Sequence, residues 1–130
     1  MIDWLERNRG ISVIITALIA IEIFFFSSIP GGVPGTGGGI RVSVIYHMII
    51  FFLFNFFLLM AIKGKREIRL TYIITAIIIS ILYAFLDEFH QFFVPFRAPD
   101  ISDILTDTVG IFLSSILILY FKKKENSFKK

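Results

Sequence analysis

The chain alternates long apolar runs with short polar stretches. The apolar runs cover about residues 11–28, 42–62, 68–86 and 101–121. Each is close to the ~20 residues that an α-helix needs to cross ~30 Å of hydrocarbon. Strands of ordinary length are shorter, and a membrane β-barrel would alternate apolar and polar positions, which these runs do not. The pattern therefore predicts an all-α, polytopic membrane protein with four transmembrane helices.

The composition supports this class. Hydrophobic residues make up 56% of the 130 residues, and 16 of them are Phe. The length is that of one domain, so we expect residues 1–130 to form a single transmembrane domain. Arg7 and Arg9 precede the first run, as in a signal peptide, but Glu22 interrupts that run and no small-residue cleavage pattern follows Ser28. We therefore expect the first run to be retained as a helix.

The basic residues predict the orientation. All but two of the 13 Lys and Arg lie in the N-terminal tail, the connection 63–69 and the tail after Phe121. With four spans these three segments fall on one side, and the positive-inside rule makes that side the cytoplasm. We therefore predict a multi-pass protein of the cell membrane with both termini cytoplasmic. Nucleic acid is not an expected partner, because the basic residues flank spans and form no folded basic face.

Polar and ionisable residues gather where the predicted helices reach the outer side. Glu22 lies near the outer end of the first helix and His47 near that of the second. The third helix ends in a polar stretch, and carboxylates spaced by three and four residues line one face of the fourth. Ionisable groups at membrane depth are costly and therefore indicate function. We predict an outer-leaflet polar pocket whose members are Glu22, His47, Asp87, Glu88, His90, Gln91, Arg97, Asp100, Asp103 and Asp107.

Several of these residues also have a purely structural explanation. Asp100 is a reasonable N-cap for the fourth helix, and Asp103 complements the positive end of that helix. Asp107 is not covered by this account, since it lies six residues past Ile101, ~9 Å down the axis. Glu22 and Asn55 could be hydrogen-bonding contacts between helices. His47 alone could be an interfacial histidine, and Tyr46 could belong to an aromatic belt.

The segment 29–41 is rich in Pro and Gly and is expected to be a flexible outer loop. An alternative is a lid over a site, with glycine amides able to approach a phosphate. A nucleotide-binding loop is not supported, because no Lys-Ser/Thr pair follows the glycines.

The polar stretch also resembles a family signature. Asp87-Glu88-x-His90-Gln91, then Arg97, then Asp100-x-x-Asp103 and Gly110 are similar to the signature of VanZ-like membrane proteins. Ser27-Ser28 and His47 match further family features. Asp107 stands where the family usually has Asn, and Val44-Ile45-Tyr46 replace a basic residue that commonly precedes the histidine. The resemblance implies an association with glycopeptide resistance, namely reduced teicoplanin susceptibility, and no defined biochemical mechanism.

Two classes of function fit these residues. In the first, the pocket binds or modifies a lipid or lipid-linked envelope component. Arg97 would hold an anionic head group, and the side chains of Gln91, His90, Asp100, Asp107 and Glu22 would contact the ligand. Acid–base chemistry would come from Asp87, Glu88, His47 and Asp103. Asp87, Glu88, Asp103 and Asp107 could hold a divalent metal, but no spacing motif identifies one, and no cofactor is indicated.

The second class is a proton or ion relay, or a non-catalytic accessory protein. Relays use buried carboxylate and histidine chains. Four helices without an internal repeat make a small transport pathway unless the chain forms a homo-oligomer. The sequence leaves both classes open.

Overall fold

The computed structural model describes residues 2–31 and 40–128. Within them it contains five α-helices and no strand: α1 (Ile2–Arg7), α2 (Arg9–Ser27), α3 (Ile40–Lys63), α4 (Leu70–Gln91) and α5 (Ile101–Phe128). The four long helices are each apolar enough over at least 18 residues to cross a membrane. The predicted all-α fold with four transmembrane helices is thus confirmed.

The helices differ from the apolar runs chiefly at their ends. α4 continues to Gln91 rather than ending at residue 86, and α5 continues to Phe128 rather than ending at residue 121. Hydropathy falls at Asp87, but the helix goes on because Asp87, Glu88 and Gln91 are buried and hydrogen-bonded inside the bundle. α1 is too short to give a hydropathy signal and was not predicted. Most of the central, lipid-spanning portion of each helix follows the predicted runs.

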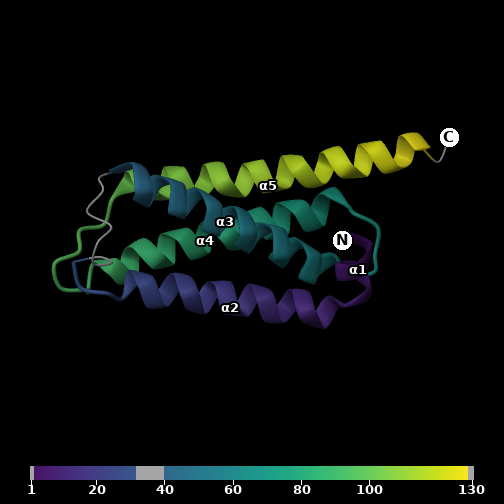
Figure 1. The fold of residues 1–130 in the computed structure, drawn as a ribbon. Helices are drawn as coiled ribbons and strands as arrows, with labels where there is room; N and C mark the ends of the chain where they lie inside the picture. Colours follow the sequence, from purple (N-terminus) through teal and green to yellow (C-terminus); the bar gives the residue numbers. More distant parts are fainter. Residues whose placement is uncertain (1, 32–39, 129–130) are drawn as a thin grey trace.

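The long helices lie side by side and alternate in direction (Figure 1). Both termini and the α3–α4 connection lie at one end of the bundle, and the α2–α3 and α4–α5 connections lie at the other. α3 is central, since it packs against α2, α4 and α5, whereas α2 contacts α4 at few points. Most large apolar side chains outside the core, such as Ile21 and Leu86, are exposed, as expected for residues that face lipid.

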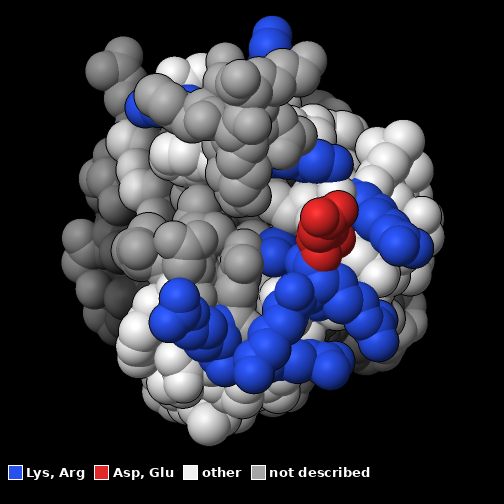
Figure 2. Space-filling model, turned by 90° about the vertical axis from the view of Figure 1, so that its right-hand side faces the viewer, with Lys and Arg blue, Asp and Glu red and all other residues white. Residues whose placement is uncertain are grey.

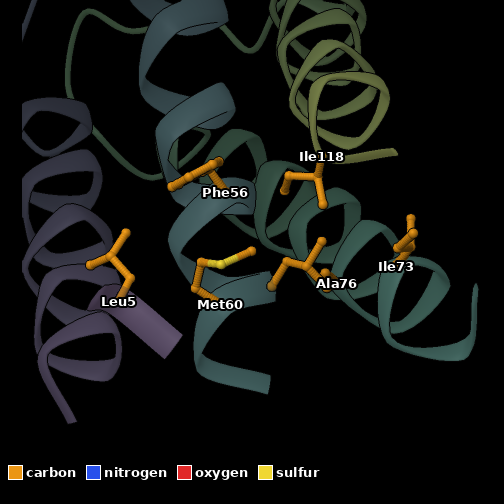
Figure 3. Close-up of a cluster of buried hydrophobic side chains, with 7 residues drawn as sticks. Leu5, Phe56, Met60, Ile73, Ala76 and Ile118 are labelled. Carbon is orange, nitrogen blue, oxygen red and sulfur yellow. The ribbon is translucent and has the colours of Figure 1, made fainter. Parts of the chain in front are cut away.

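Two apolar clusters fill the bundle. The cluster nearer the termini draws on α1, α3, α4 and α5 and consists of Leu5, Phe56, Leu59, Met60, Ile73, Ala76 and Ile118 (Figure 3). The other consists of Ile19, Ile23, Ile50, Phe51, Phe54, Ala84 and Ile111. Between them, the Asn55 amide nitrogen reaches Ile111 O, Ser114 Oγ and Ser115 Oγ at 3.1–3.2 Å, and its oxygen accepts from Ser80 Oγ at 3.2 Å. Asn55 thus connects α3, α4 and α5, as a helix–helix contact should.

The closest approach of two helices is at Gly110. A Cβ atom built there would collide with the backbone carbonyl oxygen of Met48. Glycine is therefore required at this position, because any side chain would force α5 away from α3. This close contact at Gly110 brings the first turns of α5 against the part of α3 that carries His47.

The terminal end of the bundle is basic. Figure 2 looks onto this end and shows Lys and Arg gathered over much of the described surface. Some of these side chains bind main-chain oxygens: Arg9 Nε donates to Ala61 O at 2.7 Å and Lys122 Nζ to Ile68 O at 2.5 Å. Because Ala61 is in the last turn of α3, Arg9 also complements the negative end of that helix. We call the opposite end of the bundle the acidic end.

Candidate functional site

His47 lies between two carboxylates of α5. Its Nδ1 is 3.0 Å from Asp107 Oδ1, and its Nε2 is 3.8 Å from Asp103 Oδ2. The two aspartates are four residues apart and so share one face of the helix. Gly110, one turn deeper, lets α5 approach α3 closely enough for these contacts. An ionised Asp107 accepts a hydrogen bond, so Nδ1 carries a proton in this arrangement and Nε2 faces the more exposed Asp103.

A second pair of carboxylates comes from the last turns of α4. Gln91 Nε2 donates to Asp87 Oδ2 at 3.1 Å and to Glu88 Oε1 at 3.4 Å. Glu88 Oε2 accepts the backbone N–H of Asp100 at 2.8 Å, which ties the start of α5 to the end of α4. Ser27 of α2 lies within hydrogen-bonding reach of Asp87. All three α4 side chains are at most 6% exposed.

These two groups form one cluster. The charges of Asp103, Asp87 and His47 all act on Glu88, and those of Asp87 and Asp103 act on Asp107. We define the polar cluster as His47, Asp87, Glu88, Gln91, Asp103 and Asp107. The structure thus brings together all four predicted catalytic candidates and two of the predicted ligand-binding residues. Depth along the helices was sufficient to predict this grouping.

Arg97 belongs to the edge of the cluster. Its Nη2 donates to Phe26 O at 2.8 Å, its Nε to Ile29 O at 3.3 Å and its Nη1 to Gln91 Oε1 at 3.4 Å. The guanidinium therefore covers the carbonyl end of α2 and holds Gln91, and these bonds use three of its five donors. Among the described residues it forms no salt bridge with a carboxylate. These contacts do not support the hypothesis that Arg97 holds an anionic head group.

The connection that positions Arg97 has an unusual backbone. Phe96 has φ 61°, in the left-handed region, and is 92% exposed. This conformation is costly for a bulky residue, so the neighbouring contacts must maintain it. Gly31 N donates to Pro95 O at 3.2 Å, which joins the connection to the end of α2, and Arg97 N donates to Val94 O at 3.2 Å. The tight bend turns Arg97 back toward α2.

Three other predicted residues lie outside the polar cluster. His90 turns toward α2, where its Nε2 is 2.9 Å from Ser28 Oγ and its ring lies 4.5 Å from that of Phe24. Glu22 is exposed and makes no hydrogen bond or ion pair with the described residues, but its charge acts on the Tyr46 hydroxyl. Asp100 is exposed, and its Oδ1 accepts the Ser102 backbone N–H at 2.8 Å, which lowers the pKa of the Asp100 carboxyl. Asp100 is thus the N-cap of α5, in line with its structural explanation.

Two buried oxygen atoms in this region lack a hydrogen-bond partner among the described residues. They are Asp107 Oδ2 and the hydroxyl of Tyr46. Asp107 is 0% exposed, and its charge acts on the Tyr46 hydroxyl together with those of Glu22 and Asp87. Buried polar atoms are normally hydrogen-bonded, so such a pair in one cluster needs an explanation. Tyr46 is half-buried, and no pattern in the sequence identified it as part of the site.

The cluster does not have the geometry of a metal site. Within residues 2–31 and 40–128, no three His, Cys, Asp or Glu side chains are placed to hold one ion. The four carboxylates point to different partners, namely His47, Gln91 and the Asp100 amide. The suggested divalent site at Asp87, Glu88, Asp103 and Asp107 therefore gains no support.

The polar cluster ends at an apolar layer. Phe51 and Ile111, both 0% exposed, lie between His47 and Asn55 along α3 and between Asp107 and Ser114 along α5. Beyond the Asn55 group, Leu59, Met60 and Ile118 form a further buried apolar layer. On α3 and α5 these apolar side chains thus separate the polar cluster from the Asn55 group. On α4, Tyr83 lies at the level of Phe51, and its hydroxyl donates to Ala20 O of α2 at 2.7 Å.

The fold and the site define a class: a polytopic helical membrane protein with its ionisable side chains buried at one end of the bundle. Residues 12–122 match the family model of VanZ/LLP1, so the chain belongs to the VanZ/LLP1 family. The resemblance noted in the sequence is thereby confirmed. No curated protein and no solved structure shows significant similarity to the chain.

Proposed function

We propose that the polar cluster binds the head group of a membrane amphiphile, such as a lipid-linked component of the cell envelope, and exchanges a proton with it. The observation that supports this most directly is His47, held between Asp107 and Asp103 at the acidic end of the bundle. A histidine oriented by one buried carboxylate, with its other nitrogen facing a second and more exposed carboxylate, can act as a general base.

Each side chain has a defined part in this proposal. Asp107 holds the imidazole through Nδ1, and Nε2 accepts or returns a proton on the side of Asp103, whose side chain is 20% exposed. Asp87 and Glu88 offer oxygen acceptors to hydroxyl or amine groups of the ligand, and Gln91 keeps them in place. Arg97 is a positioning residue, because its contacts are with α2 carbonyls and Gln91.

The location favours a lipid over a soluble ligand. Helix ends of a transmembrane bundle lie at the level of lipid head groups. Exposed apolar side chains flank the cluster on α4 and α5, including Leu86, Phe89, Ile101 and Leu105. These residues can contact the acyl chains of the same molecule whose head group reaches the carboxylates.

The alternative of a proton or ion relay is less well supported. A relay across the membrane needs polar groups in succession, whereas the Phe51–Ile111 layer interrupts them below His47. A second interruption follows at Leu59 and Met60. The arrangement therefore favours chemistry at one face over passage through a single chain.

The test is lipid co-purification. The detergent-extracted protein is analysed by lipid mass spectrometry beside the membranes from which it came. We expect one polar lipid class to be enriched with the wild-type chain and to be lost in His47→Gln. It should be kept in Glu67→Gln, which changes an exposed carboxylate at the basic end of the bundle. A lipid profile identical to that of the bulk membrane, with folded wild-type protein, would refute the proposal. The teicoplanin susceptibility of expressing cells, the phenotype linked to the family, can be measured with the same variants.

A further inference from the structure

The charge of the polar cluster is strongly unbalanced. The carboxylates of Asp87, Glu88, Asp103 and Asp107 outnumber the basic groups near them. His47 lies between Asp103 and Asp107, and His90 acts on Asp87 from the side of α2. Arg97, at the edge of the cluster, donates to Gln91 and to two main-chain carbonyls, and to no carboxylate among the described residues. A phosphate or carboxylate at this position would meet like charges in a poorly hydrated setting, which is unfavourable. A cation would reduce the repulsion among the four carboxylates.

The two unpartnered oxygens supply a second and independent observation. Asp107 Oδ2 is fully buried and accepts no hydrogen bond from the described residues, while its other oxygen binds His47. The Tyr46 hydroxyl is also buried without a partner in this part of the chain, and the charges of Glu22, Asp87 and Asp107 act on it. Both oxygens can accept a hydrogen bond, so a ligand group rich in donors would satisfy them. An ammonium group has three donors and no acceptor, which matches this set of oxygens.

We propose that the ligand of this site is an amphiphile with a primary ammonium group in its head group, and that Asp107 Oδ2, with the Tyr46 hydroxyl and Asp87, receives that group. This inference rests on the proposed function, because it specifies which head group the cluster binds. It assigns the phosphate or glycan part of such a lipid to the outside of the cluster, away from the carboxylates. An ammonium group is favoured over a metal ion because no three His, Cys, Asp or Glu side chains within residues 2–31 and 40–128 are placed to hold one ion.

The experiment compares head groups on one acyl composition. The wild-type protein in nanodiscs of phosphatidylcholine is titrated with phosphatidylethanolamine, N-acetyl-phosphatidylethanolamine or phosphatidylglycerol, and bound lipids are counted by native mass spectrometry. We expect phosphatidylethanolamine to bind about tenfold more tightly than the other two, since each charge-assisted hydrogen bond changes affinity by about that factor. Phosphatidylcholine, the bulk lipid, has a cation without N–H donors and should not compete. Free ethanolamine distinguishes a soluble amine ligand, and we expect it to bind at least tenfold more weakly than the lipid.

The variants separate selectivity from folding. Asp107→Asn removes the charge at nearly constant shape and should abolish the preference for the ethanolamine lipid. Glu67→Gln, at an exposed position in the α3–α4 connection at the basic end, should retain it. If Asp107→Asn fails to fold, Asp103→Asn, at a more exposed position, takes its place in the test. It should reduce the preference for the ethanolamine lipid. Equal binding of the ethanolamine and N-acetyl lipids, or a preference for phosphatidylglycerol, would overturn the ammonium assignment.

The outcomes also distinguish this inference from the proposed function. An enriched, His47-dependent lipid without an amine would preserve the proposed function and refute the ammonium assignment. The absence of any enriched lipid, together with no head-group preference in nanodiscs, would refute both.

Discussion

The Asp107 carboxylate lowers the stability of the bundle but is required by the proposed site. It is fully buried, and one of its oxygens has no partner among the described residues. A buried acceptor left unsatisfied costs ~1–3 kcal/mol, and more when charged. Replacement by Asn keeps an oxygen that can accept from His47 and removes the charge. Asp107→Asn should therefore leave the melting temperature in detergent unchanged or higher, while it abolishes lipid enrichment.

The control for this prediction is Glu67→Gln, which removes an exposed carboxylate from the α3–α4 connection at the basic end. It should change neither quantity. A marked drop in melting temperature for Asp107→Asn alone would mean that the carboxylate stabilises the bundle through His47. A normal lipid profile in a stable Asp107→Asn protein would reduce Asp107 to a structural residue.

Asn55, in contrast to Asp107, stabilises the bundle and lies outside the site. Its side chain bonds to α4 and α5 through four partners, and it lies beyond the apolar layer from the site. Interhelical hydrogen bonds in membranes are worth ~0.6 kcal/mol each on average, so Asn55→Ala should cost ~1–3 kcal/mol with its partners left unpaired. Ser80→Ala, which loses one of these bonds, should cost less. Unfolding of the purified protein by a denaturing detergent measures both, and head-group selectivity should be unaffected. Equal stability of Asn55→Ala and wild type would contradict this role.

For single residues, the sequence predicted how deep each side chain lies in the membrane but not which neighbouring helix it faces. His47, Asp87, Glu88, Asp103 and Asp107 could be grouped because position along a helix fixes depth in the membrane. The rotation of each helix depends on packing, which hydropathy does not encode. Arg97 and His90 were therefore placed at the right level, but their contacts with α2 carbonyls and Ser28 could not be predicted.

Among the helices, the contact of α3 with α5 determines the geometry of the site. A methyl group at Gly110 would collide with the Met48 carbonyl and separate the two helices. Overpacking of this kind costs ~1–3 kcal/mol, and it should also lengthen the contact between His47 and Asp107. Gly110→Ala should therefore lower both the melting temperature and the lipid binding.

Gly10→Ala is the matched control, because nothing lies within 4 Å of a Cβ at Gly10 and alanine favours the helix. It should be neutral or slightly stabilising. Equal stability of the two variants would show that the helices can shift apart without loss.

The end of a helix could be predicted from hydropathy only where the helix ends at the same residues as the apolar run. Asp100 indicated the start of α5, and the cap is present. The apolar run alone would end α4 at residue 86, whereas the helix includes the polar stretch and ends at Gln91. In the structure the polar residues after Leu86 face other helices, and burial of their side chains allows the helix to continue.

For the molecule as a whole, the two ends of the bundle have opposite character. Both termini lie at the basic end, whereas the polar cluster lies at the other (Figure 1, Figure 2). The prediction that the basic end is cytoplasmic follows from the positive-inside rule. The chain contains no Cys, so single cysteines can be added without a background signal. In intact cells an impermeant thiol reagent should label Ala98→Cys and spare Lys124→Cys.

Permeabilised cells provide the control, because both variants should then be labelled. Labelling of Lys124→Cys alone in intact cells would reverse the orientation and place the polar cluster on the cytoplasmic side. The Pro- and Gly-rich loop, for which a flexible connection or a lid was predicted, lies largely outside the described residues, since residues 32–39 are among those not described.

The contacts of Arg97 have a consequence for biosynthesis. Its acceptors on α2 and just beyond it, Phe26 O and Ile29 O, precede it by 71 and 68 residues in the chain. During translation, α2 therefore enters the membrane well before the residue that covers its carbonyl end has been made. Arg97 can satisfy those carbonyls only after α3 and α4 have followed and the α4–α5 connection has been made. The carbonyl end of α2 is thus covered late in synthesis, and the polar cluster is complete only when α5 brings Asp103 and Asp107 to His47.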